Sequence, residues 1–232
     1  MILAVTGLAR EARLIARPHL AVAVGGGDGL ALRTRIENAL DAGARRIISM
    51  GVCGALDPSL AVGDCIVATE VVTKDDSFVT HHAWTKELLT RLPASQPGAI
   101  AGTDGIIADG AAKTRLHRAT QAAAVDMESH IAARVAHERG LPFAAVRVVS
   151  DSAERSLPPA ALIAMSPTGG IDFYALLHSL SVNPGQIPAL LRTAWEAEKA
   201  FRVLFSCRHV LDPAGDPVLA PVDLGELSLH VG

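Results

Sequence analysis

The chain has 232 residues, half of them hydrophobic, and its 24 acidic and 21 basic residues give a formal net charge of -3 at pH 7. This length suits one large domain with a sizeable core. The lack of a basic excess argues against nucleic-acid binding, and no apolar run reaches the roughly 20 residues that span a bilayer. The three cysteines lack CxxC spacing, so they fit a reduced cytoplasmic protein and predict neither a disulfide framework nor a zinc site.

The first part of the chain predicts alternating strands and helices. The apolar run Met1–Thr6 predicts a strand, and a short helix is expected over residues 9–16. Glu11 falls in the first turn of that helix, where an isolated acid ordinarily compensates the helix dipole. A second strand over Leu20–Val24 runs into the glycine-rich stretch Gly25–Gly29. This stretch has neither GxGxxG nor a P-loop lysine, so it is a weak phosphate signal and is typical of a tight turn.

The next part continues the alternation. Arg45–Met50 predicts a strand that leads into Gly51–Leu56, where two glycines beside small residues would let a ligand approach the backbone closely. His81 and His82 match no metal-ligand spacing and are interpreted as a loop pair. Further strands and helices are predicted over residues 65–72, 83–92, 99–102 and 111–119.

The segment 124–153 places two carboxylates in apolar surroundings. Glu128 opens a helical pattern on its apolar stripe, where a charge is costly unless it is paired or functional. Asp126 can cap this helix. Phe143–Val149 predicts a strand buried on both faces, and Asp151 follows it at the edge where α/β sheets bind ligands. From the pattern alone, two interpretations are equally favoured. The two acids are functional, or Glu128 is an ordinary helix-terminus acid and Asp151 an ordinary turn residue.

The last part predicts mainly helices. Residues 157–170 are interrupted by prolines and predict a loop or short helices over the rim of the sheet. Helices are expected over 171–180 and 187–205, and residues 207–232 form a tail that packs on the body or on a partner. The whole pattern predicts a single α/β domain, residues 1–206, with a central, mostly parallel mixed sheet between helices in three layers.

Four motifs occur in a fixed order between residue 1 and about residue 180. They are Gly51-Val-Cys-Gly-Ala-Leu56 with Val62-Gly-Asp64, Gly102-Thr-Asp-Gly-Ile-Ile107, Val125-Asp-Met-Glu-Ser129 and Val146-Arg-Val-Val-Ser-Asp-Ser-Ala153. Together they resemble the nucleoside phosphorylase/nucleosidase superfamily, and above all the methylthioadenosine/S-adenosylhomocysteine nucleosidases. Within the superfamily the chain looks most like the phosphorylase-type family associated with hopanoid biosynthesis, which removes adenine from adenosylhopane.

The resemblance implies roles for the matching residues. Asp151 matches the general acid that protonates purine N7, which neutralises the charge developing on a poor leaving group. Glu128 matches the carboxylate that holds the ribose hydroxyls, and Met127 the residue packed beneath the sugar. Ile106 and Ile107 match the base pocket, although the nucleosidases have a phenylalanine where this chain has Ile106. The expected substrate-binding set also includes Val52, Cys53, Gly54 and Ser150.

The nucleophile decides between two reaction classes. Glu11 matches the water-activating acid of the nucleosidases, in an alignment that needs a one-residue shift. The hexameric purine phosphorylases have an arginine at this position, and they have Arg-x-Gly-Ser-Cys-Gly where this chain has Ser49–Gly54. Because a glutamate would repel phosphate, hydrolysis is favoured. Arg10, Arg33 and Arg35, with the nearby glycine-rich loop, stay open as a different phosphate site.

The resemblance therefore implies a cytoplasmic enzyme that uses water to release adenine from a 5′-substituted adenosine. The favoured substrate is adenosylhopane, whose lipid would bring the enzyme to a membrane surface. We expect a homodimer or higher oligomer, with no metal and no cofactor. Phosphorolysis, recycling of methylthioadenosine or S-adenosylhomocysteine, and nucleoside binding without cleavage stay open as alternatives.

Overall fold

The computed structural model describes residues 1–163, 178–179 and 182–212. The helix predicted over 171–180 and the tail beyond residue 212 lie almost entirely outside these ranges. Within them, no helix is long and apolar enough to cross a membrane.

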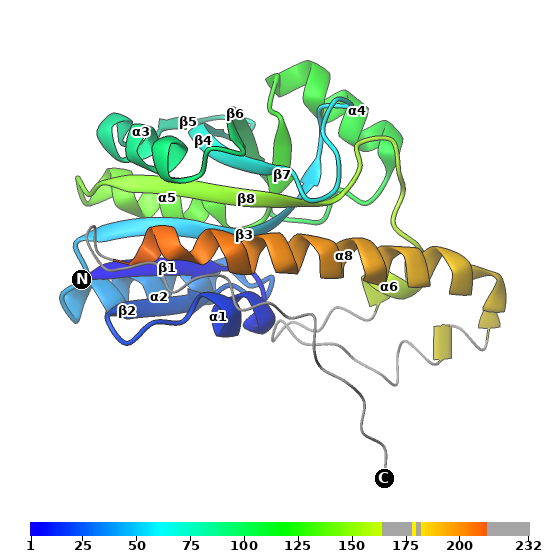
Figure 1. Ribbon diagram of the computed structural model, residues 1–232, viewed down its shortest axis with the longest axis horizontal. Coiled ribbons are helices and arrows are strands. Elements are labelled where there is room, and N and C mark those ends of the chain that lie inside the picture. Colours follow the sequence, from blue (N-terminus) through cyan, green and yellow to red (C-terminus); the bar gives the residue numbers. More distant parts are fainter. Residues whose placement is uncertain (164–177, 180–181, 213–232) are drawn as a thin grey trace, which may run out of the picture.

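One eight-stranded sheet runs through the described residues (Figure 1). Its strands are β1 (Ile2–Thr6), β2 (Leu20–Val24), β3 (Arg46–Ala55), β4 (Cys65–Val72), β5 (Ser77–Val79), β6 (Ser95–Gly102), β7 (Ala124–Asp126) and β8 (Phe143–Asp151). Parallel pairs join β1 to β2 and β3, β3 to β8, β4 to β6, and β6 to β7. Antiparallel pairs join β3 to β7, and β4 to β5 and β8. The predicted mostly parallel mixed sheet is confirmed.

Part of this sheet closes into a ring. β3 pairs with β8, β8 with β4, β4 with β6, β6 with β7, and β7 returns to β3 through Gly54 and Ala55. The closure was not predicted, because β7 is only three residues long and carries too little pattern to be recognised. It brings the ends of β7 and β8 against the C-terminal half of β3.

Helices cover both faces of the sheet, which confirms the layered α/β architecture (Figure 1). α2 (Gly29–Asp41) and α5 (Ser129–Glu138) pack on one face, and α1 (Ala9–Ile15), α3 (His82–Arg91) and α8 (Ile187–Cys207) on the other. β8 alternates between the two cores: Ala145 and Val149 face α5, whereas Val146 and Val148 face α8. α4 (Gly110–Thr120) and α6 (Pro159–Ile163) lie near the rim.

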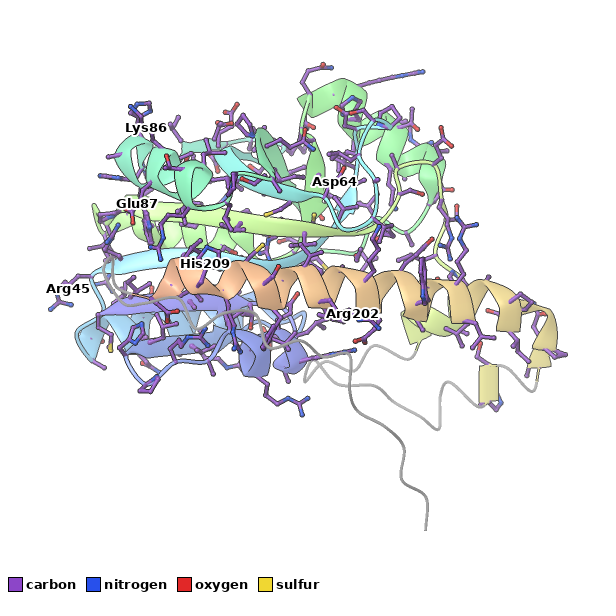
Figure 2. All side chains as sticks on the ribbon, viewed as in Figure 1. Arg45, Asp64, Lys86, Glu87, Arg202 and His209 are labelled. Atoms are coloured by element: carbon purple, nitrogen blue, oxygen red, sulfur yellow. The ribbon has the colours of Figure 1, made fainter. Side chains whose placement is uncertain are left out.

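Several element ends differ from the sequence-based expectation. β3 continues through Gly51 to Ala55 instead of ending at Met50, with a bulge between Cys53 and Gly54. Pairing with β8 sustains this extension, and β8 itself ends at Asp151, which is therefore a strand residue and not a turn residue. The packed body continues past residue 206, because α8 ends at Cys207 and a 3-10 turn, Arg208–Leu211, follows it. In Figure 2 the labels of Arg202 and His209 mark this C-terminal part of the body.

Candidate active site

Three buried carboxylates surround the C-terminal half of β3. Glu11 lies in the first turn of α1, just after β1; Glu128 precedes α5, just after β7; and Asp151 ends β8. Their exposed fractions are 2%, 9% and 8%. Burial of three acids in one region is costly without partners, so the contacts of each carboxylate define what the site can do.

Glu11 is held entirely by backbone donors. Its Oε2 accepts the N–H groups of Gly7 and Leu8, both at 2.8 Å, and its Oε1 accepts the N–H of Val52 at 2.7 Å. Glu11 therefore does cap its own helix, as an ordinary first-turn acid would, but it also ties that helix to β3. Burial raises the pKa of Glu11, while the Arg147 guanidinium and these N–H groups oppose the rise. A carboxyl with a raised pKa is better matched to accepting a proton near neutral pH.

Arg147 is the centre of the cluster, and the sequence analysis assigned it no role. It is fully buried in β8, and its Nη2 forms an ion pair with Asp126 and donates to Ser49 Oγ at 2.6 Å. The same Nη2 lies 3.8 Å from Oε2 of Glu128. Its Nε and Nη1 have no hydrogen-bond partner among the described residues. An arginine inside an otherwise apolar strand is the signal that could have identified it, because such a charge requires buried partners.

Glu128 shares this guanidinium with other acids. Burial raises the pKa of Glu128 to about 8; Arg147 opposes the rise, and the charges of Asp126 and Glu11 add to it. One cation facing three carboxylates cannot compensate all of them when each is ionised. The cluster therefore exchanges protons as a coupled unit.

Glycines make room for these side chains. A Cβ added at Gly51 would lie 2.6 Å from Oε1 of Glu11 and would also meet Nη1 of Arg147. At Gly7 it would lie 2.7 Å from Oε1 of Glu128, and at Gly54 3.2 Å from Oδ1 of Asp151. We expected Gly51 and Gly54 to admit a ligand to the backbone. The structure shows that side chains of the protein lie where a Cβ at these glycines would be, and close approach of a ligand stays a prediction.

Asp151 lies beside Gly54 and has its own partners. Its Oδ1 forms an ion pair with Lys113 of α4, and its Oδ2 lies 2.9 Å from Ser150 Oγ. That hydroxyl also lies 3.0 Å from the carbonyl oxygen of Cys53, whereas the thiol of Cys53 is buried in the core, which raises its pKa. The structure thus brings Ser150, Cys53 and Asp151 together, and adds Lys113, which had not been singled out.

A groove of about 1220 Å³ opens beside Glu128, whereas neither Glu11 nor Asp151 is among the described residues that line it. Met127 and Glu128 line it, together with the loop Gly102–Asp104 and parts of α2 and α5. Neither Ile106 nor Ile107 lines this groove: Ile106 is 40% exposed, and Ile107 packs on a small core cluster that includes Val125.

The three arginines considered for a separate phosphate site do not converge. Arg10 pairs with Glu198 of α8, Arg33 pairs with Glu138 at the end of α5, and Arg35 donates to the carbonyl oxygen of Val24 at 2.7 Å. Each guanidinium thus interacts with a different part of the protein, and the three do not share a site.

Comparison with known families identifies the class of protein. A family model described as the phosphorylase superfamily matches residues 20–164, which is more than half of the chain, and the chain belongs to this superfamily. Curated relatives include the 5′-methylthioadenosine/S-adenosylhomocysteine nucleosidases of Shewanella sp. (strain MR-7), 27% identical over 136 residues, and of Baumannia cicadellinicola subsp. Homalodisca coagulata, 31% identical over 134 residues. Each alignment covers 48% of this chain, and it covers 57% and 58% of the respective relative. The chain thus spans little more than half the length of these relatives.

Solved structures share the fold over a longer range. The futalosine hydrolase of Helicobacter pylori strain 26695 is similar with a TM-score of 0.63 and 18% identity, covering 90% of this chain and 96% of that one. The Campylobacter jejuni 5′-methylthioadenosine/S-adenosylhomocysteine nucleosidase gives a TM-score of 0.59 and 18% identity, covering 88% and 98%. At this identity the likeness concerns the fold alone.

Proposed function

We propose that this protein is a nucleosidase that uses water to release adenine from a 5′-substituted adenosine. The named activity of the curated relatives supports the reaction class. The observation that carries the proposal is the placement of Glu11 and Asp151 against one stretch of β3, beside Gly51 and Gly54. A base and an acid on either side of a bound nucleoside are what N-glycosidic hydrolysis requires.

In the proposed reaction Glu11 removes a proton from water as the water oxygen bonds to C1′ of the ribose. The bond between C1′ and N9 breaks, and its electron pair stays with the purine. Asp151 gives a proton to N7, so adenine leaves as a neutral base. Glu128 holds the ribose hydroxyls, and this contact strengthens as positive charge develops on the sugar. The products are adenine and a free 5-substituted ribose.

Charge supports water over phosphate as the nucleophile. Glu11, Glu128 and Asp126 all lie around the single guanidinium of Arg147. A phosphate dianion would add two negative charges to a cluster that already has more acids than cations. Water adds none, and Nη1 of Arg147, which no described residue satisfies, offers a donor beside Oε1 of Glu11.

The groove supports a bulky 5′ substituent. Its lining includes Met127 and Glu128, the residues proposed to contact the sugar, and its volume of about 1220 Å³ exceeds the roughly 300–1,000 Å³ of ordinary ligand pockets. Within the proposed class, we therefore favour adenosylhopane, with its triterpene in or over this groove, and keep methylthioadenosine as the second candidate because the curated relatives act on it by name.

Adenine release from two substrates tests the proposal. One is methylthioadenosine and the other an adenosine with a long 5′ hydrocarbon, each measured with and without inorganic phosphate. We expect turnover without phosphate, a free sugar as product, and a higher kcat/KM for the hydrocarbon substrate. Asp151→Asn should lower kcat by about 10²–10⁴-fold. A phosphate requirement with a sugar 1-phosphate product would replace hydrolysis by phosphorolysis, and binding without adenine release would leave a nucleoside-binding protein.

A further inference from the structure

Lys113 is a fully buried lysine in α4, with an exposed fraction of 0%. Its ammonium pairs with Oδ1 of Asp151 and donates to the carbonyl oxygens of Ser152, at 2.9 Å, and Arg155, at 3.3 Å. An ammonium has three N–H donors, so each has an acceptor. These three hydrogen bonds fix the position of the Lys113 ammonium, which lies against Asp151, the carboxylate proposed as the general acid.

The helix α4, which carries Lys113, is hydrogen-bonded to the segment that follows Asp151 at the end of β8. The N–H of Gly110, at the start of α4, donates to Ser156 Oγ at 3.1 Å, and the N–H of Leu157 donates to the carbonyl oxygen of Ala108 at 2.9 Å. A Cβ at Gly110 would lie 2.5 Å from the carbonyl oxygen of Glu154. The start of α4 thus packs directly on the segment that follows β8, and these contacts join the helix that carries Lys113 to the segment next to Asp151.

The hydrogen bonds to the segment after β8 do not by themselves explain why residue 113 is a lysine. Neutral donors could satisfy the two carbonyl oxygens, and burying an ammonium is costly unless a charge compensates it. Asp151 provides that compensation, and in return one of its oxygens is engaged by a cation. Among the described residues, its other oxygen, Oδ2, accepts a hydrogen bond only from the Ser150 hydroxyl, and it is the oxygen that we assign to the base.

We propose that Lys113 is a positioning residue of the nucleosidase reaction: it holds Oδ1 of Asp151 so that Oδ2 delivers its proton to the purine. This rests on the proposed function. Before the reaction Oδ2 of Asp151 takes up a proton from solvent, and when that proton leaves for N7, Asp151 becomes a carboxylate again. The ammonium of Lys113 compensates that new charge at the moment when the bond between C1′ and N9 breaks, so its effect falls on the chemical step.

Kinetics of Lys113→Met test the assignment, because methionine has a similar length and no charge. We expect kcat for adenine release to fall about 100-fold with KM changed less than threefold, since Lys113 acts on the reaction and not on binding. Lys113→Arg keeps the charge and should retain at least ten times the kcat of Lys113→Met. The exposed Lys86, labelled in Figure 2, gives the matched control: Lys86→Met should leave kcat unchanged. Wild-type kcat in Lys113→Met overturns the inference.

A double-mutant cycle separates positioning from a general structural role. If Lys113 acts through Asp151, then Lys113→Met added to Asp151→Asn should lower kcat less than threefold further. An undiminished 100-fold loss in the Asp151→Asn background overturns the inference. Should Lys113→Met fail to fold, Lys113→Arg replaces it in the same double-mutant cycle. The loss of kcat that Lys113→Arg causes in the wild-type background should vanish in the Asp151→Asn background. An equal loss in both backgrounds overturns the inference. A wild-type protein inactive on every nucleoside instead contradicts the proposed function itself.

Discussion

Oε1 of Glu11 accepts a hydrogen bond of 2.7 Å from the backbone N–H of Val52, so the first helix of the chain is fastened to the middle of its central sheet. The other carboxylate oxygen caps the same helix through two N–H groups at 2.8 Å. One side chain therefore stabilises the start of α1 and places a buried acid beside Arg147.

Glu11→Gln should separate these two tasks. A glutamine side chain has one acceptor oxygen, which can keep the two hydrogen bonds from Gly7 and Leu8. Its NH₂ group then faces the N–H of Val52, and the third hydrogen bond is lost. We expect kcat to fall by about 10²–10⁴-fold, as for removal of a general base, and the free energy of unfolding to fall by about 1–3 kcal/mol. Steady-state kinetics and urea titration measure both. Glu37→Gln, which removes a half-exposed acid of α2, should change neither; retained activity in Glu11→Gln would exclude Glu11 as the base.

Arg147→Met should destabilise the protein strongly. The substitution leaves Asp126 and Glu128 buried without their cation, and breaking a buried ion pair costs about 3–5 kcal/mol. Arg134→Met is the matched control, because the pair between Arg134 and Asp76 is half exposed and should contribute no more than about 1 kcal/mol. Urea unfolding of the two variants measures the difference, and equal stabilities would contradict the central role of Arg147.

Gly51→Ala tests the close packing at β3. The added methyl would lie 2.6 Å from Oε1 of Glu11 and would also meet the Arg147 guanidinium. Both side chains are buried and cannot swing into solvent, so we expect at least a tenfold loss of kcat together with reduced stability. Gly185→Ala, whose methyl would meet, within the part of the chain that the structure describes, only the amide oxygen of exposed Asn183 at 3.3 Å, should leave kcat unchanged. An active, stable Gly51→Ala would show that the cluster rearranges.

The stability of the protein should depend on pH through Glu128. Burial raises the pKa of Glu128 from 4.5 to about 8, so the folded state binds this proton more tightly than the unfolded state. Its contribution is fully present below pH 4.5 and is lost as the pH rises to about 8. Relative to Glu128→Gln, the free energy of unfolding should therefore fall across this window, by at most about 1.4 kcal/mol per pH unit. Urea titrations from pH 5 to 9 measure it, and a difference that rises with pH would reverse the assignment.

The sequence predicted the layered fold because its strongest patterns come from long, regular elements. The buried run Phe143–Val149 and the amphipathic helix over 187–205 are close to the observed β8 and α8. The short strands β5 and β7 were not predicted, because three residues show no periodicity that distinguishes a strand from a loop. Closure of the sheet depends on β7 and was therefore not foreseen either.

For the site, the sequence identified acids but not the cations that accompany them. Glu128 and Asp151 stand out from their apolar surroundings, Glu11 was singled out only by the family resemblance, and the structure places all three near β3. Lys113 lies in a helix of ordinary pattern, whereas Arg147 interrupts an apolar strand, a signal that the sequence analysis did not use. Lys113 meets Asp151 through a contact between α4 and β8, and Arg147 meets Asp126 and Glu128 through contacts of β8 with the segment 126–128. No local pattern encodes such long-range contacts, so neither cation could be matched to its carboxylate before the fold was known. The proposed roles of Met127, Ile106, Ile107 and Ser150 stay predictions.

The position of β3 has a consequence for how this protein folds. Its partner β1 lies more than 100 residues before its partners β7 and β8 in the chain, and each of the three strands ends at or just before one of the three acids. Contacts of such high sequence separation form slowly, because distant segments must first be brought together. Recovery of activity after dilution from urea should therefore lag behind recovery of helical signal, since no fragment that folds early carries the complete set of acids.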